Sequence, residues 1–464
     1  MGTLQVPRAL LERYAVAAPR YTSYPTAVDW KNNATADEYA TAVSAAATRS
    51  GEPLALYVHI PFCQELCLYC GCNVHITRNN TRGPVYVQHL KEQLSHAAQR
   101  GLGVRPLTQH HWGGGTPTWL PCELIEELCS AINAVFRPAP NAEVAIEVDP
   151  RVTTDAQLAL LGRLGFNRLS LGVQDFDPQV QQAVKREQSY EETQRVIEVG
   201  RASGFRSVNI DLIYGLPHQT VAGFNDTVQR TITLRPERVA LFHYAHVPWL
   251  KKHQRTIDQA AVPDIEAKFA IFSAAVEAFS AAGYVSIGLD HFALPDDELS
   301  VARDAGTLQR NFMGYSTRAG AELLPLGVSA IGEIDGAYWQ NDADLFSWQR
   351  RVAENAGNAV VRGHRLSAED KLRRALIMEI MCLGKLDFEV WSQRIGEPMA
   401  QRFATELKDL EPLAADGLVD IDARGLRLTA LGQVFMRNVA VVFDVYHRQR
   451  AASGSAAQPF SRTL

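Results

Sequence analysis

The sequence predicts an α/β protein in which parallel strands form a partial (β/α)6 barrel, similar to an incomplete TIM barrel. The first observation is that a strand-like run followed by an amphipathic helix occurs six times between residues 54 and 282. Six such units in sequence require a parallel sheet with right-handed crossovers. The second is that polar or glycine-rich residues follow every strand. A barrel brings all its strand ends onto one face, whereas a doubly wound sheet concentrates its ligand contacts in one crevice, so we favour the barrel.

The six units follow one another in order. Each strand is predicted from a run rich in β-branched and aromatic residues, and each helix from apolar residues at helical spacing. The predicted strands are LALYVHI (54–60), LTQHHW (107–112), EVAIEV (143–148), RLSLGV (168–173), SVNIDLIY (207–214) and RVALFHY (238–244). The helices that follow them are predicted at about 86–100, 122–136, 155–164, 191–203, 223–234 and 264–282.

Further segments flank this barrel, which we assign to residues 51–340. Residues 1–50 contain the aromatic and proline-rich run APRYTSYPTAVDW, which cannot form a core alone and is predicted to cover the active site. Residues 341–450 are mainly helical and include the hairpin-like GLVDIDARGLRLTALG, which predicts a small winged-helix-like domain. The tail, residues 451–464, is predicted to be flexible because it is rich in small and polar residues.

Composition and charge argue against several classes of protein. The net charge is −5 and no long Lys/Arg block occurs, so we expect neither a nucleic-acid partner nor a charged membrane surface. The first twenty residues lack a secretory-signal pattern and no apolar window is long enough for a membrane span, so we expect a cytoplasmic protein. No interface signature is evident in the sequence, and we expect a monomer.

The stretch YVHIPFCQELCLYCGCN places Cys63, Cys67, Cys70 and Cys72 within ten positions. The chain has seven cysteines, and this crowding argues for metal or redox chemistry in a reducing compartment. One interpretation is a structural zinc site, but zinc usually takes two short-spaced pairs from separated parts of the chain. An iron–sulfur cube is larger, so one loop can place a thiolate on each of three corners and leave one iron open. The spacing favours the cluster.

A second signal is HWGGGTPT, residues 111–118, which follows the next predicted strand. Consecutive glycines let the backbone approach a ligand without interference from Cβ atoms. The pattern Cys-x3-Cys-x2-Cys after the first barrel strand, followed by this glycine run, resembles the radical S-adenosylmethionine (SAM) enzymes. The resemblance implies that Cys63, Cys67 and Cys70 hold a 4Fe–4S cluster whose open iron binds SAM, and it leaves Cys72 without a ligand role.

More of the chain resembles one branch of that superfamily, the oxygen-independent coproporphyrinogen III oxidases of bacteria. The resemblance covers roughly residues 15 to 445. The matching segments are PRYTSYPTA, YVHIPFC, CGCN, HWGGGTPT, IEVDPR, LGVQDF, REQ, NIDLIYGLP, YAHVP, GLDHFALPDDEL and LLPLGVSAIG.

This resemblance implies oxidative decarboxylation of two propionate side chains of coproporphyrinogen III to vinyl groups, which gives protoporphyrinogen IX in haem biosynthesis. A 5′-deoxyadenosyl radical would remove a hydrogen atom from each propionate. The electron would come from a donor such as flavodoxin or ferredoxin. Because the cluster and SAM generate the radical, the resemblance implies no catalytic side chain.

The resemblance also implies two bound SAM molecules. Positions that match contacts to the cluster-bound molecule are Tyr57, Gly114, Glu147 and Ile331. Positions that match contacts to the second molecule are Tyr69, Gly115, Thr116, Gln174, Arg186, Asp211 and Ala245. Taken singly, Asp211 could cap the next helix, Arg186 could be a solvated charge, and Gln174 could be an ordinary buried polar residue. Their order on successive strand ends favours the cofactor role.

The substrate carries four propionates, so basic groups should line its pocket. Arg20 is a candidate, together with nearby Tyr21 and Tyr24. Residues 314–320, GYSTRAG, depart from the Gly-Tyr-Thr-Thr pattern of the family, which leaves local substrate contacts there open.

The alternative function is that of a haem chaperone or transfer protein of the related radical SAM subgroup. That subgroup typically lacks the PRYTSYP extension and has an aromatic residue where this chain has Cys72. Both features favour the oxidase.

Overall fold

The computed structural model describes residues 6–453 and 460–463 and confirms the predicted partial barrel. Its centre is a run of parallel strands in the order β13-β1-β4-β5-β6-β7-β8. These strands are β13 (Glu322–Leu326), β1 (Leu54–Ile60), β4 (Leu107–Gly114), β5 (Pro138–Val148), β6 (Arg168–Gln174), β7 (Ser207–Tyr214) and β8 (Arg238–His243). Within the described residues the two ends of the sheet do not pair with each other, so the barrel stays open on one side.

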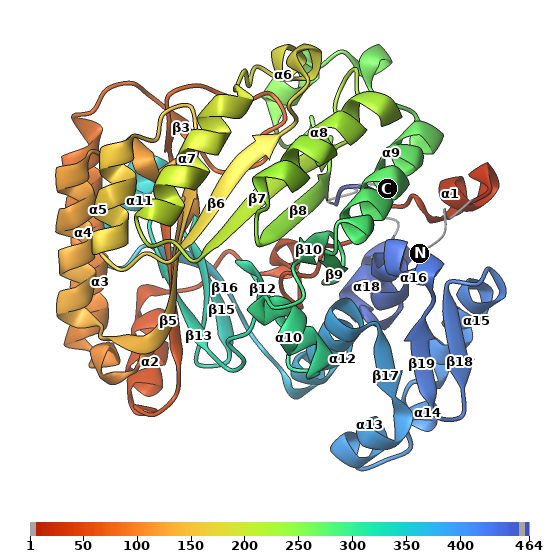
Figure 1. The fold of residues 1–464 in the computed structure, drawn as a ribbon. Helices are drawn as coiled ribbons and strands as arrows, with labels where there is room; N and C mark the ends of the chain where they lie inside the picture. Colours follow the sequence, from red (N-terminus) through yellow and green to blue (C-terminus); the bar gives the residue numbers. More distant parts are fainter. Residues whose placement is uncertain (1–5, 454–459, 464) are drawn as a thin grey trace.

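The crossover helices cover the outer face of this sheet, as Figure 1 shows. They are α3 (Arg82–Gln99), α4 (Cys122–Val135), α5 (Asp155–Arg163), α7 (Tyr190–Ala202), α8 (Val221–Leu234) and α9 (Ile265–Ala281). Local sequence sets where several begin: Thr154 and Ser189 form capping boxes at the starts of α5 and α7. Each of the six predicted strand–helix units is therefore present. β1 and β7 have the predicted bounds, whereas β5 begins five residues before its predicted start.

The alternation of side chains along the strands determines which residues face the inside of the barrel. On β1, Leu56 and Val58 belong to the large core beneath the helices, whereas Tyr57 is absent from that core and half-buried. On β7, Ile210 is in the core and Asp211 is not. Burial of each such aliphatic side chain contributes about 1.5–3 kcal/mol, which fixes the register of the strand against a one-residue slip. The residues between the core positions are thereby directed into the barrel.

The sheet continues beyond residue 340, where the sequence analysis ended the barrel domain. Three antiparallel strands extend it past β13: β14 (Ile331–Ile334), β15 (Ala337–Asn341) and β16 (Val360–Arg365). Helix α11 (Leu345–Glu354) packs on α3 and contributes Trp348 to the main core. These short antiparallel strands break the strand–helix rhythm, which explains why the rhythm did not predict them.

The C-terminal unit has its own core and is mainly helical, as predicted. Its small antiparallel sheet has the order β17-β19-β18, with β17 (Lys385–Asp387), β19 (Gly425–Leu428) and β18 (Val419–Asp422). Its helices are α12 (Ala368–Leu383), α13 (Phe388–Ile395), α14 (Met399–Arg402), α15 (Ala404–Ala415), α16 (Ala430–Val434), α17 (Met436–Ala440) and α18 (Val445–Ala452). The hairpin formed by β18 and β19 is the one predicted from the sequence.

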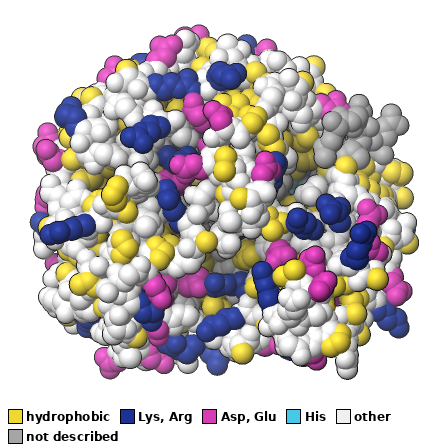
Figure 2. Space-filling model, turned by 60° about the horizontal axis from the view of Figure 1, so that its bottom comes forward, with side chains coloured by type: hydrophobic (Ala, Val, Ile, Leu, Met, Phe, Trp, Pro, Cys, Tyr) yellow, Lys and Arg dark blue, Asp and Glu magenta, His cyan; other side chains and the backbone are white. Residues whose placement is uncertain are grey.

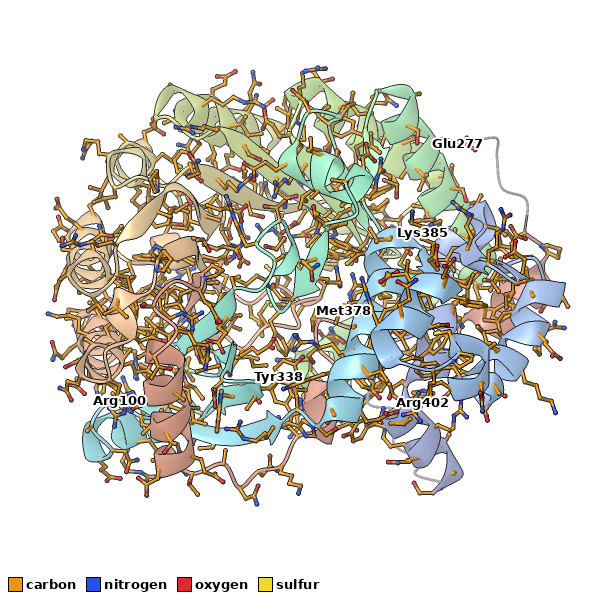
Figure 3. The ribbon with its side chains drawn as sticks, turned by 90° about the horizontal axis from the view of Figure 1, so that it is seen from below. Arg100, Glu277, Tyr338, Met378, Lys385 and Arg402 are labelled. Carbon is orange, nitrogen blue, oxygen red and sulfur yellow. The ribbon has the colours of Figure 1, made fainter. Side chains whose placement is uncertain are left out.

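A cavity of about 490 Å³ lies where the barrel meets the C-terminal unit. In Figure 3, Tyr338 of β15 and Met378 of α12, which both line this cavity, lie on facing sides of it. The short hairpin of β11 (Gln309–Asn311) and β12 (Gly314–Ser316) adds further lining. On the face shown in Figure 2, acidic and basic side chains are interspersed. In the described part of the chain, no helix has the length and apolar character to cross a membrane.

The N-terminal extension joins the barrel to the C-terminal unit. It contains α1 (Arg8–Tyr14) and α2 (Ala36–Ala47). Tyr21 and Tyr24 between them are fully buried in the core of the C-terminal unit, and the Tyr21 hydroxyl donates to Asp444 at 3.0 Å. These two tyrosines were candidates for the substrate pocket, but packing buries both side chains in this core.

One arginine holds the extension in place. Arg437 on α17 is 2% exposed, and its guanidinium donates to the backbone carbonyls of Ala18, Pro19, Ser461 and Arg462. Residues 454–459 and 464 of the predicted flexible tail lie outside the described residues. Residues 460–463 are anchored rather than flexible, because they pair with the backbone of residues 16–18.

We expect Arg437→Ala to release both chain ends from the C-terminal unit. The substitution leaves several buried carbonyls without a donor, at a cost of about 1–3 kcal/mol for each unsatisfied group. Urea unfolding should show a loss of about 3 kcal/mol or more, and limited proteolysis should cut faster near residues 15–22. Arg424→Ala is the matched control, because that side chain is 92% exposed. Equal stability of the two variants would contradict the anchoring role.

Candidate active site

A cavity of about 850 Å³ lies at the carboxyl ends of the barrel strands. Its walls come from the loop after β1, the ends of β4 to β7, and the short helix α6 (Pro178–Ala183) with the residues after it. Predicted site residues that line it are Cys63, Cys67, Tyr69, Cys70, Gly114, Gly115, Thr116, Glu147, Gln174, Arg186 and Asp211. Cys72 also lines it. The barrel therefore brings together residues that are up to 148 positions apart, from Cys63 to Asp211.

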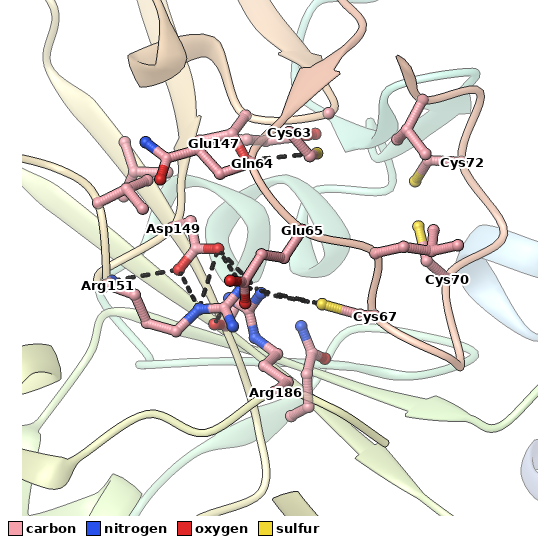
Figure 4. A pocket seen from close by; sticks show the side chains of 18 of the residues that line it. Cys63, Gln64, Glu65, Cys67, Cys70, Cys72, Glu147, Asp149, Arg151 and Arg186 are labelled. Atoms are coloured by element: carbon pink, nitrogen blue, oxygen red, sulfur yellow. Dashed lines mark hydrogen bonds and ion pairs between the residues drawn. The ribbon is translucent and has the colours of Figure 1, made fainter. Parts of the chain in front are cut away.

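The cysteine loop is a short structured turn (Figure 4). Cys63 lies on the two-residue strand β2 (Phe62–Cys63), which pairs with β3 (His75–Ile76), and the Cys70 amide donates to the Cys67 carbonyl at 3.1 Å. In the described part of the chain, no three His, Cys, Asp or Glu side chains converge on a single-ion site. The three thiols stand around one cavity instead, which fits the separate corners of an iron–sulfur cube.

The surroundings of the thiols differ. Burial raises the pKa of Cys63 to about 11, although its sulfur shares a hydrogen bond of 3.6 Å with the Thr116 hydroxyl. The neighbouring Cys72 outweighs burial and lowers the pKa of Cys70 below its usual range. Metal ligation requires the thiolate, so this lowering favours Cys70 as a ligand.

Two guanidinium groups lie against the sulfur of Cys67. Arg186 Nη1 donates to Cys67 Sγ at 3.6 Å and Arg151 Nη2 donates at 3.8 Å. Both arginines also donate to Asp149, Arg186 at 3.1 Å and Arg151 at 2.7 Å (Figure 4). Burial would raise the pKa of Asp149, but the charge of Arg186 and the hydrogen bonds from Arg151 hold it below its usual range. The wall beside the cysteine loop is thus cationic, and only partly neutralised by one carboxylate.

Arg186 keeps one donor for a ligand. Its Nη2 donates to the Gly172 carbonyl, whereas its Nε is buried without a hydrogen-bond partner among the described residues. A buried unsatisfied N–H costs about 1–3 kcal/mol, so a bound anion that accepts from it would be favoured. This orphaned donor fits the carboxylate of an amino-acid ligand.

On the opposite wall, Glu147 is on β5 and its side chain contacts β4. It accepts from His111 Nε2 at 3.1 Å and from the Gly114 amide at 3.1 Å. Burial alone would raise the pKa of Glu147, but these hydrogen bonds and the nearby His111 hold it below its usual range. The side chain keeps 42% of its surface open, which leaves an ionised carboxylate facing the cavity.

The glycine run is required by close packing. A Cβ at Gly113 would stand 2.7 Å from the Glu147 carboxyl, and a Cβ at Gly115 would stand 2.7 Å from the Pro61 backbone. Gly114 has a φ of +112°, which side chains rarely tolerate. The glycines therefore do more than let a ligand approach: they let the cysteine loop and Glu147 pack against β4.

Asp211 on β7 carries the most perturbed carboxyl of the cavity. Burial and the charge of Glu147 raise its pKa to about 7, against a hydrogen bond of 2.8 Å from Asn209. At neutral pH this group is a mixture of acid and carboxylate. It can therefore accept from, or donate to, a ligand group.

Three predicted residues do not line the cavity. Tyr57 stacks on His111 with ring centroids 5.9 Å apart, behind Glu147. Ala245 is adjacent to the cysteine loop, because Gln254 Nε2 donates both to its carbonyl at 3.1 Å and to the Tyr69 carbonyl at 3.0 Å. Ile331 begins β14 and packs with the Trp30 and Tyr338 cluster.

Several neighbours of the site were not selected from the sequence. Asp149 and Arg151 belong to the IEVDPR segment, and their opposite charges two residues apart at a strand end were a usable signal. His111 precedes the glycine run and carried no signal beyond its position. The contacts of residues 251–254 with the cysteine loop carried no local signal, since they join segments about 180 residues apart.

The chain is similar to known families and proteins. Residues 57–231 match the model of the radical SAM superfamily, and residues 366–435 match that of the HemN C-terminal domain. The oxygen-independent coproporphyrinogen III oxidase of Salmonella typhimurium is 43% identical over 98% of each chain, and that of Escherichia coli K12 is 42% identical over 98% of each. The solved structure of the coproporphyrinogen III oxidase HemN from Escherichia coli, described as a radical SAM enzyme, superposes with a TM-score of 0.89. That structure is 41% identical and covers 96% of this chain and 100% of its own.

We expect Asp211→Asn to stabilise the cofactor-free protein at alkaline pH. The folded-state pKa is raised, so the wild type is destabilised once pH rises above the unfolded value near 4, and the penalty is complete above about 7. A shift from 3.8 to about 7 corresponds to up to about 4 kcal/mol. Anaerobic urea unfolding at pH 8 should show this gain, and the two proteins should converge near pH 4.

The matched control is Asp226→Asn on the exposed surface of α8, where the side chain is 61% exposed. It should change stability by less than about 0.5 kcal/mol at either pH. A gain for Asp211→Asn that does not depend on pH would contradict a perturbed carboxyl at this position.

Proposed function

This chain belongs to the family of oxygen-independent coproporphyrinogen III oxidases, and we propose how its residues divide the work of that reaction. The reaction is the oxidative decarboxylation of two propionate side chains of coproporphyrinogen III to vinyl groups, which gives protoporphyrinogen IX in haem biosynthesis. It uses a 4Fe–4S cluster and two molecules of SAM. When bound, the reduced cluster and SAM supply the one-electron chemistry that removes a hydrogen atom from an unactivated C–H bond.

The cysteine loop carries the proposal. We assign Cys63, Cys67 and Cys70 as the ligands of the cluster, supported by their place around one cavity and by the guanidinium donors beside Cys67. Hydrogen bonds to cluster sulfurs and ligands tune reduction potential, so Arg186 and Arg151 have a second task there. Cys72 lines the same cavity beside Cys70 and is left outside the ligand set.

The two opposed walls fit the zwitterionic end of SAM. In the second molecule the carboxylate complements Arg186, whose Nε lacks a partner among the described residues, and the ammonium complements Asp211. Glu147 complements the ammonium or ribose of the cluster-bound molecule. Gly114 belongs with Glu147 on the wall of the cluster-bound molecule, and Tyr57 orients His111 behind it. For the second molecule we assign the remaining lining set, which is Tyr69, Gly115, Thr116, Gln174, Arg186 and Asp211, with Ala245 at its edge. Ile331, on β14, is the residue of the set with the weakest structural support.

Arg20 is the proposed substrate contact from the N-terminal extension. It lies over the Phe242 ring of β8 at 5.4 Å and pairs with Asp290, while 31% of its side chain stays open. Burial and the nearby charges of Arg437 and Arg310 lower its pKa to about 9, so it is still a cation at neutral pH. A propionate carboxylate would relieve this crowding of positive charge. The extension, residues 1–50, would thereby cover the active site and contribute to it.

Localisation, oligomeric state and electron supply are part of the same proposal. We propose that the chain acts in the cytoplasm as a monomer, without a nucleic-acid or membrane partner, and receives its electrons from a flavodoxin or ferredoxin. The catalytic part is the barrel assigned to residues 51–340, and residues 341–450 close its open side.

The deciding experiment is anaerobic reconstitution followed by turnover of coproporphyrinogen III. Iron, sulfide, 5′-deoxyadenosine, CO2 and the vinyl product should all be found. Stoichiometric haem binding without CO2 release would favour a haem-transfer protein instead. Zinc in place of iron and sulfide would contradict the radical mechanism altogether.

The cysteines should divide into ligands and a supporting residue. Cys67→Ser should abolish the iron–sulfur absorption of the anaerobically reconstituted protein, because a cube held by two thiolates is lost. Cys72→Ser should keep iron and sulfide close to wild-type content while altering cluster reduction. Cys129 is a buried residue of α4, away from the cysteine loop in the sequence. Cys129→Ser is therefore the control and should leave the metal content unchanged. Complete loss of iron in Cys72→Ser would contradict this division.

Arg186→Gln should weaken SAM binding by at least about tenfold, because it removes a charge-assisted contact worth about 1.5–3 kcal/mol. Equilibrium binding of SAM to the reconstituted protein is the measurement. Arg230→Gln on the exposed face of α8, where the side chain is 48% exposed, is the matched control. An unchanged affinity together with an unchanged iron content would contradict the assignment.

A further inference from the structure

The segment that follows β8, residues 247–256, exposes an unusual combination of side chains. Trp249 is 52% exposed and Leu250 is 62% exposed. Lys252 and Arg255 are exposed beside them. Large exposed apolar side chains next to cations are typical of a protein interface, where tryptophan and arginine contribute most of the binding energy.

Side chains of the same segment donate hydrogen bonds to the backbone of the cysteine loop. Lys251 Nζ donates to the Cys72 carbonyl at 2.8 Å, and His253 Nε2 donates to the Cys70 carbonyl at 2.8 Å. Gln254 Nε2 donates to the Tyr69 carbonyl at 3.0 Å. Three side chains of one short segment therefore bond the backbone that carries a proposed cluster ligand. A partner bound to this segment would be separated from the Cys70 backbone by a single hydrogen-bonded side chain, that of His253.

The surface leaves the cavity free. Residues of the segment 247–256 are absent from the lining of the large cavity, which includes the exposed residues Glu65, Lys185 and Glu187. A protein bound at the segment would approach the cluster from the side away from SAM. Electron delivery and ligand entry could then proceed at the same time.

Its charge stands out against the whole chain. The net charge is −5, yet no Asp or Glu occurs between residues 238 and 257. Lys251, Lys252 and Arg255 form no ion pair with any described residue. An acidic partner would find unneutralised cations here, and complementary charge speeds association between proteins.

We propose that residues 247–256 are the docking surface for an acidic one-electron carrier protein that reduces the cluster. This inference rests on the proposed function, since it needs a cluster behind the cysteine loop. In each encounter the reduced carrier loses one electron and the oxidised cluster gains it, with no bond made or broken. Interfaces of electron carriers are small and transient, so a patch of this size suffices.

The test compares protein and chemical reductants on the reconstituted holoenzyme. The variants are the charge reversal Lys252→Glu with Arg255→Glu, and separately Trp249→Ala. Reduced flavodoxin is the carrier probe and dithionite the small-molecule probe. Each variant should bind flavodoxin at least about tenfold more weakly and be reduced by it correspondingly more slowly, whereas reduction by dithionite should match wild type. Wild-type binding should weaken as salt rises from about 50 to about 300 mM.

A matched double reversal, Lys385→Glu with Arg424→Glu, changes the net charge equally at exposed positions of β17 and of the turn between β18 and β19. It should leave flavodoxin binding unchanged. Equal weakening by both double variants, or no weakening by either, would overturn the docking surface. Binding of the wild type to anionic phosphatidylglycerol vesicles but not to flavodoxin would overturn it in favour of a membrane contact.

The outcome is separable from the proposed function. If wild type reduced by dithionite forms no vinyl product, the function fails while flavodoxin binding is still measurable. If product forms with dithionite and the docking variants behave as wild type with flavodoxin, only the docking surface fails.

Discussion

The close approach of β1 and β4 at their carboxyl ends, with the Glu147 side chain of β5 packed against β4, is the constraint on which the site depends. The Gly115 amide donates to the Ile60 carbonyl at 2.8 Å, and the Thr116 amide donates to the Phe62 carbonyl at 2.9 Å. These bonds extend the pairing of β1 and β4 into the start of the cysteine loop. They form because Gly115 has no side chain to hold these two segments apart, and Gly113 likewise leaves room for the Glu147 carboxyl. The glycine run thus sets the position of Cys63.

Only some of the charged side chains in the cavity form ion pairs with one another. Arg151 and Arg186 share Asp149 beside the cysteine loop, whereas Glu147 and Asp211 face them without a guanidinium partner of their own. A cavity with a cationic wall and an anionic wall suits a ligand that carries both charges. Glu147 and Asp211 lie on β5 and β7. Arg151 and Arg186 lie in the loops after β5 and α6, so the barrel holds the two sets of charges in place.

The chain ends complete the structure around the barrel. The extension crosses from the C-terminal unit to β8, and one buried arginine, Arg437, fastens both the extension and residues 461–462. The open side of the partial barrel is thereby closed by segments from both ends of the chain. Such an arrangement ties the fold of the C-terminal unit to the position of Arg20.

Local sequence predicted the strand–helix rhythm, the class of site and the spacing of the three cysteines, because these depend on periodicity and on residues close together in the chain. Thus LALYVHI became β1 with the expected bounds, and the three thiols fell within one loop. Tertiary structure alone decided which charges meet. Three such contacts join residues 37, 183 and 423 positions apart. They are the ion pair of Asp149 with Arg186, the hydrogen bond from His253 to the Cys70 carbonyl, and the hydrogen bond from Tyr21 to Asp444. No local pattern encodes such contacts, since they arise only when the curving of the sheet and the packing of its neighbours bring distant segments together.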